Sequence, residues 1–544
     1  MAGLDEGLTS ESSGGPSERQ CLTSLVACAA LRFPRRPATV DVASGRRKTW
    51  SEVAESVAKV AGGFRSLGVG RASRVAVLAF NSDRYYETYF AVPYAGGVIV
   101  PLNIRLAPPE IRFILEDCSV EVLLVDKTFA PMVKAFQDIP SLKFIVYMGE
   151  DEKPEGITRT FDELVAAEPV LDARRGGDDV AGIFYTGGTT GRAKGVMLTH
   201  GNLFVNCLGT SSKWTRKDTY LHAAPMFHLA NGVGMLSATY VSGCHVFIPR
   251  FAPDAFLNTI AEHKVTRAMG VPAMITALVH FPGVDKLDLS SLSSLVYGAA
   301  PMTESLLQKA MATFPNAEFM QGYGMTECSP GIANLDWEYH QGAEAKLKSV
   351  GLPVPYAEVR IFDDKDEEVA PGVVGEICVR GPNVMKGYFR QPEATAAALR
   401  GGWMHTGDGG YKDEDGFLFL VDRLKDMIIT GGENVYSAEV ENAVSSFPGV
   451  TMCAVIGTPD EKMGELVTAI VQPAAGAEIE LGALQEHCRQ LIAGYKIPRR
   501  VEVKDALPLS GAGKVLKTEL RKPFWEGHEL GNVYAKDGAK TSYQ

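Results

Sequence analysis

The sequence predicts an α/β protein made of several structural units, and three observations support this. Helical and strand patterns alternate in the first part of the chain. Around residues 350–425 the pattern changes to short strands separated by Gly and Pro turns. After 422–425 a compact α/β segment of about 120 residues remains, close to the usual size of an independent domain. With 544 residues the chain is long enough for several cores, which excludes a single small binding module.

The first part of the chain predicts crossover units and largely parallel sheets. Thr49 and Glu52 have the spacing of a capping box, and apolar residues recur at helical intervals after them. Three apolar runs predict buried strands, at 75–80, 97–100 and 120–125. Strands that alternate with helices in this way are typical of parallel sheets.

The charge balance excludes some partners. The chain has 54 Lys and Arg against 65 Asp and Glu, a net charge of −11. This acidic balance opposes broad contact with nucleic acid or an anionic membrane, although a local basic pocket stays open. The segment 219–249 has no Asp, Glu, Lys or Arg, but its Pro, His, Asn and Gly residues suit a lipid-exposed helix poorly. We predict a buried helix there, followed by a strand at 245–248, and no transmembrane segment.

The cysteines and the chain ends indicate a reducing, cytoplasmic location. The nine cysteines are scattered without a Cys-x-x-Cys, so we predict buried thiols rather than a zinc site or disulfides. Residues 1–20 are acidic and rich in Ser and Gly, which predicts a disordered tail rather than a signal or transit peptide. The last residues do not match the peroxisomal address Ser-Lys-Leu.

The strongest local signal is a strand that runs into a loop of Gly and Thr and then a lysine. Glycines let backbone N–H groups approach an anion, hydroxyls add donors, and a lysine adds charge. A Walker A loop is excluded because Lys194 lies between Ala193 and Gly195. The loop residues are Thr186, Gly187, Gly188, Thr189, Thr190 and Gly191.

Four further clusters follow at wide separations. Each is weak alone, since a Gly-Tyr-Gly turn or a single Glu is common. They lie at 321–327 (Gln-Gly-Tyr-Gly-Met-Thr-Glu), 402–408 (Gly-Trp-Met-His-Thr-Gly-Asp), 422–434 and 508–517.

In this order the five motifs resemble the adenylate-forming superfamily, and most closely its fatty-acyl and general acyl-CoA synthetases. The superfamily also includes 4-coumarate–CoA ligases, luciferase and peptide-synthetase adenylation domains. The resemblance runs from about residue 30 to about residue 525. It implies a large N-terminal domain of two α/β subdomains and a small β-rich subdomain, hinged to a small mobile α+β C-terminal domain. The implied parts are a tail at 1–20, the N-terminal adenylation domain at 21–422, a hinge at 423–425, the C-terminal domain at 426–525 and a tail at 526–544.

The resemblance also implies a reaction in two steps. A carboxylate attacks the α-phosphate of ATP, giving acyl-AMP and pyrophosphate; the thiol of CoA then attacks the acyl carbon, and AMP leaves. The implied partners are ATP, Mg²⁺, CoA and a small carboxylic acid, with no nucleic acid and with the oligomeric state open. Catalysis of phosphoryl chemistry depends mostly on positioning and electrostatic stabilisation.

Residue roles follow from the resemblance. The loop 186–191 and Lys194 would hold the β- and γ-phosphates, Thr326 would contact the α-phosphate and Glu327 would bind Mg²⁺. Tyr323 would stack on adenine and Asp408 would bind the ribose. The remaining implied residues are Gly298, Ala299, Ala300, Gln321, Gly322 and Gly324 for AMP, Arg423 for the ribose, Lys514 for adenylation, Lys425 for the hinge, and Gly431, Gly432 and Glu433 for the CoA tunnel.

The sequence also departs from the family pattern. The loop commonly begins Thr-Ser-Gly, whereas Thr186-Gly187-Gly188 lacks one hydroxyl, and Ala193 stands where proline is frequent. We expect modest kinetic effects, because neither change touches a charged group. The run 431–434 differs from the Lys-Gly-Phe-Gln of coumarate ligases, which weakens a strict phenylpropanoid assignment.

The stretches implied to form the acyl pocket are apolar or small. They include His228, Gly232 and Gly324, and they offer no Arg or Lys to pair with a second carboxylate. We predict a hydrophobic monocarboxylate, with a fatty acid first and an aryl-propenoic acid second. His228 fits equally well as a pocket residue and as a core histidine.

Three alternatives stay open. In the first, adenylation is kept but the acceptor is a carrier-protein phosphopantetheine instead of CoA. In the second, the acceptor is oxygen, as in luciferase. A silent scaffold on the same fold would have lost chemistry at Glu327, Asp408, Arg423 or Lys514, and all four are present.

Overall fold

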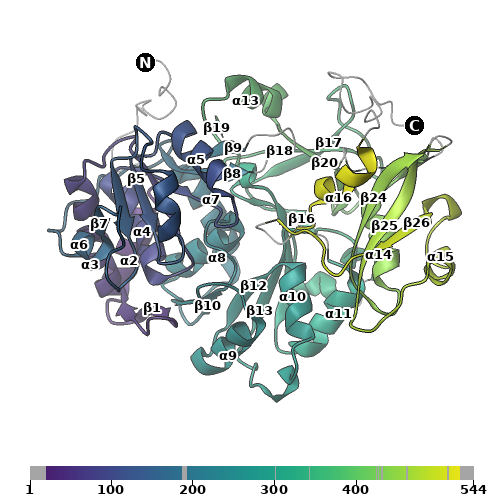
Figure 1. The fold of residues 1–544 in the computed structure, drawn as a ribbon, viewed down its shortest axis with the longest axis horizontal. Coiled ribbons are helices and arrows are strands. Elements are labelled where there is room, and N and C mark those ends of the chain that lie inside the picture. The colour runs from purple at the N-terminus through teal and green to yellow at the C-terminus, as the bar shows by residue number, and fades with distance from the viewer. Residues whose placement is uncertain are drawn as a thin grey trace.

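The computed structural model describes residues 20–186, 193–300, 302–341, 344–423, 426, 428–430, 433–460, 463–510 and 514–526. Two large and two small β-sheets organise this part of the chain. The elements that follow residue 426 gather at one end of the molecule, opposite the N-terminal helices (Figure 1).

The first large sheet has eight strands and confirms the predicted parallel core. The predicted strands at 75–80, 97–100 and 120–125 are present and pair in parallel. In spatial order the strands are β19 (Gly387–Tyr388), β9 (Lys194–Thr199), β8 (Val180–Thr186), β4 (Val98–Pro101), β3 (Arg74–Leu78), β5 (Val122–Val125), β6 (Phe144–Tyr147) and β7 (Arg159–Thr160). Strand β9 is antiparallel to both of its neighbours, so the sheet is mixed at this edge.

Helices connect the strands of this region. The predicted capping box is confirmed at the start of α3, where Thr49 N–H donates to Glu52 at 2.7 Å and the Thr49 side chain accepts from Glu52 N–H. The helices are α2 (Thr23–Arg32), α3 (Trp50–Ser66), α4 (Asp83–Ala95), α5 (Pro108–Asp117), α6 (Phe161–Val165) and α7 (His200–Thr210).

The second large sheet has nine strands, parallel at its centre and antiparallel at both edges. In spatial order they are β16 (Leu352–Pro353), β15 (Gly331–Leu335), β14 (Glu318–Gly324), β13 (Ser294–Gly298), β12 (Arg267–Gly270), β10 (Thr219–His222), β11 (Cys244–Phe247), β1 (Pro37–Asp41) and β2 (Arg47–Thr49). Its helices are α8 (Leu229–Tyr240), α9 (Pro253–His263), α10 (Pro272–Val279), α11 (Glu304–Thr313) and α12 (Glu344–Leu347).

The uncharged segment 219–249 forms β10, α8 and β11, which agrees with the predicted buried helix and strand. Within the described residues, no helix combines the length and apolar character needed to span a membrane.

Two small sheets complete the fold. The predicted β-rich region is an antiparallel sheet of β17 (Glu358–Phe362), β18 (Gly375–Arg380), β20 (Met404–Lys412) and β21 (Leu418–Arg423), accompanied by α13 (Pro392–Ala398). The last sheet contains β23 (Glu433–Val435), β22 (Ile428–Thr430), β25 (Gly464–Pro473), β24 (Val450–Asp460) and β26 (Arg500–Val503). With it go α14 (Ser437–Ser445), α15 (Leu481–Arg489) and α16 (Lys517–Trp525). A separate apolar cluster from Ile428 to Ile497 forms the core of this last unit.

One expectation about the cysteines is wrong. All nine are free thiols, as predicted, but Cys28 is exposed and Cys21, Cys244 and Cys453 are only partly buried. Cys28 is exposed because it lies on the outer face of α2, whose buried face carries Leu25, Val26 and Ala29.

Candidate active site

The carboxyl ends of β13 and β14 provide a close-packed backbone edge for the predicted nucleotide site. Gly298 and Gly322 are partners in the parallel register of these strands. A Cβ atom on Gly298 would lie 2.2 Å from the Gly322 carbonyl oxygen, and one on Gly324 would lie 1.7 Å from the Pro330 carbonyl oxygen. Side chains therefore do not fit at Gly298 and Gly324. The carboxyl edge of such a sheet is where ligands of α/β folds bind.

Other predicted AMP-binding residues lie on the same edge. Gln321 and Gly322 belong to β14, and Ala299 follows β13 in a left-handed conformation with φ of 63°. The Gln321 side chain accepts a hydrogen bond of 3.4 Å from the hydroxyl of Tyr297 on β13. Ala300 is half-buried directly beyond Ala299. The structure thus brings the three motif stretches 298–300, 321–324 and 326–327 to one place.

Tyr323 and Asp408, predicted to contact adenine and ribose, are in direct contact. The hydroxyl of Tyr323 donates a hydrogen bond of 2.8 Å to the Asp408 carboxylate. Tyr323 lies on β14 of the nine-stranded sheet and Asp408 on β20 of the four-stranded sheet, so this bond joins two subdomains. Burial, together with the nearby carboxylate, raises the pKa of Tyr323 well above its ordinary value, so the hydroxyl stays protonated and donates.

Glu327 is held in a buried position by a tyrosine that the sequence analysis missed. Thr326 and Glu327 form a short 3₁₀ helix with Cys328, and Glu327 is 7% exposed. The Tyr388 hydroxyl donates a hydrogen bond of 2.9 Å to the Glu327 carboxylate. Burial and the adjacent carboxylate raise the pKa of Tyr388, so it remains a donor. No local pattern around Tyr388 could have indicated this role, because it depends on a contact across 61 residues.

The segment that carries Tyr388 links the two large sheets. Met385 N–H donates to the Glu327 carbonyl at 2.8 Å, and Asn383 donates to the Cys328 carbonyl at 3.1 Å. Tyr388 itself belongs to β19, which pairs with β9 of the eight-stranded sheet. Glu327 follows β14 of the nine-stranded sheet. These contacts therefore connect Glu327 to β9, the strand that begins with Lys194.

Lys194 is close to the same tyrosine. Its Nζ lies 4.9 Å from the centroid of the Tyr388 ring, a cation–π distance. Thr186 and Lys194 are opposite each other in the β8–β9 register, so the predicted phosphate loop connects two adjacent strands. The loop residues Gly187, Gly188, Thr189, Thr190 and Gly191 lie outside the described residues.

Some predicted residues of the hinge and C-terminal domain can be placed only in part. Arg423 ends β21, and its backbone is the register partner of Asp408. Glu433 begins β23. Lys514 lies on a hairpin of the C-terminal domain, with Leu509 bridged to Val515. Lys425, Gly431 and Gly432 lie outside the described residues.

The structure places His228 and Gly232, two of the predicted acyl-pocket residues, at the start of α8 and within it. His228 precedes α8 and packs on the Phe227 ring with centroids 4.4 Å apart. Gly232 lines an apolar cavity of about 20 Å³ between α8, α4 and β8, whose lining includes Phe90 and Phe184 but neither His228 nor Gly324. A volume this small holds about one water molecule.

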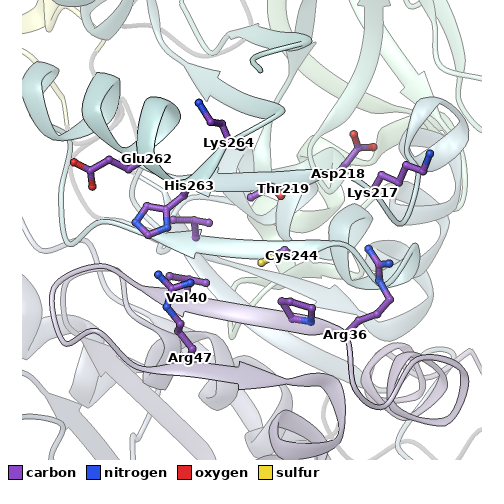
Figure 2. A pocket seen from close by; sticks show the side chains of 12 residues that line it. Arg36, Val40, Arg47, Lys217, Asp218, Thr219, Cys244, Glu262, His263 and Lys264 are labelled. Atoms are coloured by element: carbon purple, nitrogen blue, oxygen red, sulfur yellow. The ribbon is translucent and has the colours of Figure 1, made fainter. Parts of the chain in front are cut away.

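A larger cavity of about 580 Å³ lies away from the predicted chemistry (Figure 2). It is found where β1, β10 and β11 begin, with Pro37, Thr219 and Cys244 in its wall. Since β10 is parallel to β12, β13 and β14 in turn, this is the amino edge of the sheet, opposite to Gly298 and Gly324. None of the predicted site residues lines it. Exposed Arg47, Lys217 and Lys264 form its rim.

One cluster of metal-ligand side chains lies in the β-rich sheet. The ligand-type atoms of Glu376, Cys378 and His405 lie within 4.8 Å of one another. His405 Nδ1 is 2.8 Å from Glu376, and Arg400 lies 3.1 Å from the same carboxylate oxygen. Because a guanidinium already neutralises this carboxylate, the cluster is a hydrogen-bonded network rather than a prepared cation site. Glu327, the residue predicted to bind Mg²⁺, offers a carboxylate, and carboxylate oxygens are the ligand type that Mg²⁺ prefers.

Comparison with known proteins identifies two family domains in this chain. Residues 26–389 match the AMP-binding enzyme family, and residues 439–514 match the AMP-binding enzyme C-terminal domain.

Individual relatives match over most of their length. The chain is 42% identical to a feruloyl-CoA synthase of Amycolatopsis sp over 483 residues, covering 88% of this chain and 94% of the relative. It is 34% identical to a fatty acid–[acyl-carrier-protein] ligase of Streptomyces coeruleorubidus, and the match covers 93% of this chain and 97% of the relative. The ATP-bound structure of MatB from Rhodopseudomonas palustris superposes with a TM-score of 0.83 at 30% identity, covering 93% of this chain and all of MatB.

Proposed function

Because this chain belongs to the AMP-binding enzyme family, we propose that it is an acyl-CoA synthetase that activates a hydrophobic monocarboxylic acid with ATP and transfers the acyl group to CoA. The observation that carries the proposal is the set of contacts made by two tyrosines, Tyr323 and Tyr388. Tyr323 joins Asp408, and Tyr388 joins Glu327 to Lys194, so the groups assigned to base, sugar, metal and phosphates are held together.

In the proposed first step, an oxygen of the substrate carboxylate attacks the α-phosphate of ATP, and the bond to the bridging oxygen of pyrophosphate breaks. Lys194 and Thr326 offset the negative charge on the phosphate oxygens, and Asp408 orients the ribose. Glu327 would hold Mg²⁺, which would supply further charge neutralisation. Such fixed charges accelerate phosphoryl chemistry mainly by positioning and electrostatic stabilisation.

In the proposed second step, the CoA thiolate attacks the acyl carbon, the thioester forms, and AMP leaves as its phosphate takes the electron pair of the broken bond. Lys514 acts in the first step only, because the C-terminal domain rotates at the hinge 423–425 between the two steps. A lysine suits this transient role, since it is a point charge on a long flexible stem.

For the acid itself we propose an aryl-propenoic acid as the first candidate and a fatty acid as the second. The feruloyl-CoA synthase shares 42% identity with this chain, whereas the fatty acid ligase shares 34%. This reverses the order predicted from the sequence alone, in which the fatty acid came first. Both acids are apolar monocarboxylates, as predicted from the sequence. A diacid is disfavoured because its second carboxylate would be buried without a partner charge.

A substrate panel tests the proposal. The purified protein is incubated with ATP, Mg²⁺ and ferulic acid, cinnamic acid, fatty acids of several lengths or malonate, with and without CoA. Pyrophosphate, AMP and thioester are then measured. We expect turnover with an apolar monocarboxylate that requires CoA for thioester, and loss of turnover in Glu327→Gln, which is isosteric. No pyrophosphate with any acid would refute the proposed activity, and best turnover on malonate would refute the apolar pocket.

The choice of acceptor needs its own experiment, because one relative is named for an acyl-carrier protein. Acyl-AMP is offered with CoA or with a holo-carrier protein, and thioester is measured. We expect thioester with CoA. Thioester only with the carrier protein would replace CoA in the proposal.

A further inference from the structure

A hydrogen bond joins the residue opposite Lys514 to the N-terminal domain. Arg105 Nη1 donates to the carbonyl oxygen of Ser510 at 2.7 Å, although the two residues are 405 positions apart in the chain. Arg105 belongs to the large domain and Ser510 to the C-terminal unit. This bond therefore connects the part of the C-terminal unit next to Lys514 to the large domain.

The hairpin leaves the Ser510 carbonyl open for this contact. Ser510 N–H donates to the Lys514 carbonyl at 2.7 Å, which is one half of a regular antiparallel pair. The second bond of such a pair would run from Lys514 N–H to the Ser510 carbonyl. Here Lys514 N–H donates to the Ser510 hydroxyl instead, at 3.1 Å. The Ser510 carbonyl accepts from Arg105 instead, so the arginine holds the residue directly opposite Lys514.

The large domain places Arg105 at the edge that carries the predicted phosphate loop. Arg105 lies in the loop after β4, and its N–H donates to the Asn103 side chain at 3.0 Å, which shapes the turn. Strand β4 pairs in parallel with β8, whose last residue is Thr186. The carboxyl ends of these neighbouring strands point to the same edge, so Arg105 and the phosphate loop follow them there.

We propose that Arg105 is a positioning residue that holds the C-terminal domain in the arrangement used for acyl-AMP formation, by binding Ser510, the residue opposite Lys514. The inference rests on the proposed function. Its consequence is selective: Arg105 supports the first half-reaction, in which Lys514 acts, and is dispensable for the second.

The test measures the two half-reactions separately in Arg105→Ala and Arg105→Lys. Because a charged donor to one carbonyl is lost at an exposed site, we expect acid-dependent ATP–pyrophosphate exchange to fall by about fivefold to twentyfold in Arg105→Ala. We expect Arg105→Lys to recover part of it, since an ammonium also donates to a carbonyl. Thioester formation from supplied acyl-AMP and CoA should match the wild type in both variants.

A double-mutant cycle with Lys514→Ala distinguishes positioning from general damage. If Arg105 acts through Lys514, Arg105→Ala causes no further loss of exchange in the Lys514→Ala background. Arg112→Ala is the matched control, because Arg112 is a surface arginine in the next helix whose ion pairs with Asp138 and Glu116 remain inside the large domain.

Each outcome decides between the alternatives. Equal loss of both half-reactions, wild-type exchange in Arg105→Ala, or additive losses in the double mutant would each overturn the role of Arg105. Absence of exchange in the wild-type protein with every acid would instead refute the proposed function, so the two failures are distinguishable.

Discussion

The hydroxyl of Tyr388 donates a 2.9 Å hydrogen bond to Glu327, while its ring lies 4.9 Å from the Lys194 ammonium. One side chain thus contacts both the carboxylate assigned to the metal and the cation assigned to the phosphates. It does so because β19 returns from the β-rich region to pair with β9. Tyr388 therefore holds the two groups at a fixed separation before any ligand binds.

The first prediction concerns this tyrosine. Tyr388→Phe keeps the ring next to Lys194 but removes the donor to Glu327, whose buried carboxylate loses a partner. We expect acyl-AMP formation to fall by about tenfold, with a higher Mg²⁺ requirement, and to fall further in Tyr388→Ala. Pyrophosphate exchange is measured as a function of Mg²⁺ concentration.

The matched control for this prediction is Tyr411→Phe. Tyr411 stacks on Phe419 in the β-rich sheet, with ring centroids 4.9 Å apart, so its ring contact lies within that sheet. We expect its exchange rate and Mg²⁺ dependence to equal those of the wild type. An unchanged Mg²⁺ dependence in Tyr388→Phe would argue against a role of Tyr388 in organising Glu327.

The second prediction separates the half-reactions at Lys514. In Lys514→Ala we expect acyl-AMP formation to fall by more than about a hundredfold, because a charge that stabilises the transition state is lost. Thioester formation from supplied acyl-AMP should survive. Lys504→Ala, which removes an exposed lysine of the same domain, should leave both steps unchanged. Equal loss of both steps in Lys514→Ala would contradict the domain rotation.

The third prediction concerns backbone packing at the edge proposed to bind the nucleotide. In Gly324→Ala the new Cβ would lie 1.7 Å from the Pro330 carbonyl oxygen, so the strand ends must separate. We expect the free energy of unfolding to fall by at least about 2 kcal/mol and ATP binding to weaken. Gly482→Ala is the control, because a Cβ there meets no atom within 4 Å and its effect should stay below about 1 kcal/mol. Denaturant unfolding and nucleotide titration measure the two effects, and equal behaviour of the variants would contradict the packing argument.

The fourth prediction concerns acid stability. His200 begins α7, is fully buried, and accepts a hydrogen bond from Leu22 N–H at Nδ1 over 3.3 Å. Burial lowers the pKa of His200 to about 4, from an ordinary value of 6.5. Between these values the unfolded chain binds the proton and the folded chain does not, so stability is lost as the pH falls from 6.5 to 4. The contribution of this histidine is about 3 kcal/mol at most.

His200→Asn tests this contribution, because its amide oxygen can accept the Leu22 N–H without titrating. We expect the denaturation midpoint of the variant to depend less steeply on pH between 6.5 and 4 than that of the wild type. Above pH 7 the denaturation midpoints of the two proteins should change with pH in the same way. Parallel curves over the whole range would show that His200 does not titrate on unfolding.

Local patterns were sufficient for much of the fold. The capping box at Thr49, the apolar runs of β3, β4 and β5, and the switch to short antiparallel strands after residue 350 each report on nearby residues and were confirmed. Such signals are readable because helix caps and strand periodicity depend on neighbours in the chain. The exposure of Cys28 was predicted wrongly, because the buried face of α2 is defined by what packs on it.

The sequence by itself determined which chemical groups this protein carries and in what order: a Gly and Thr loop, Thr326 and Glu327, Asp408 and Lys514. Only the tertiary structure decided which of them touch and through what. The contacts of Tyr388 with Glu327, of Tyr323 with Asp408 and of Arg105 with Ser510 join residues 61, 85 and 405 positions apart. Contacts of this kind arise from strand order and domain docking, which bring together chain segments whose local sequences carry no trace of one another.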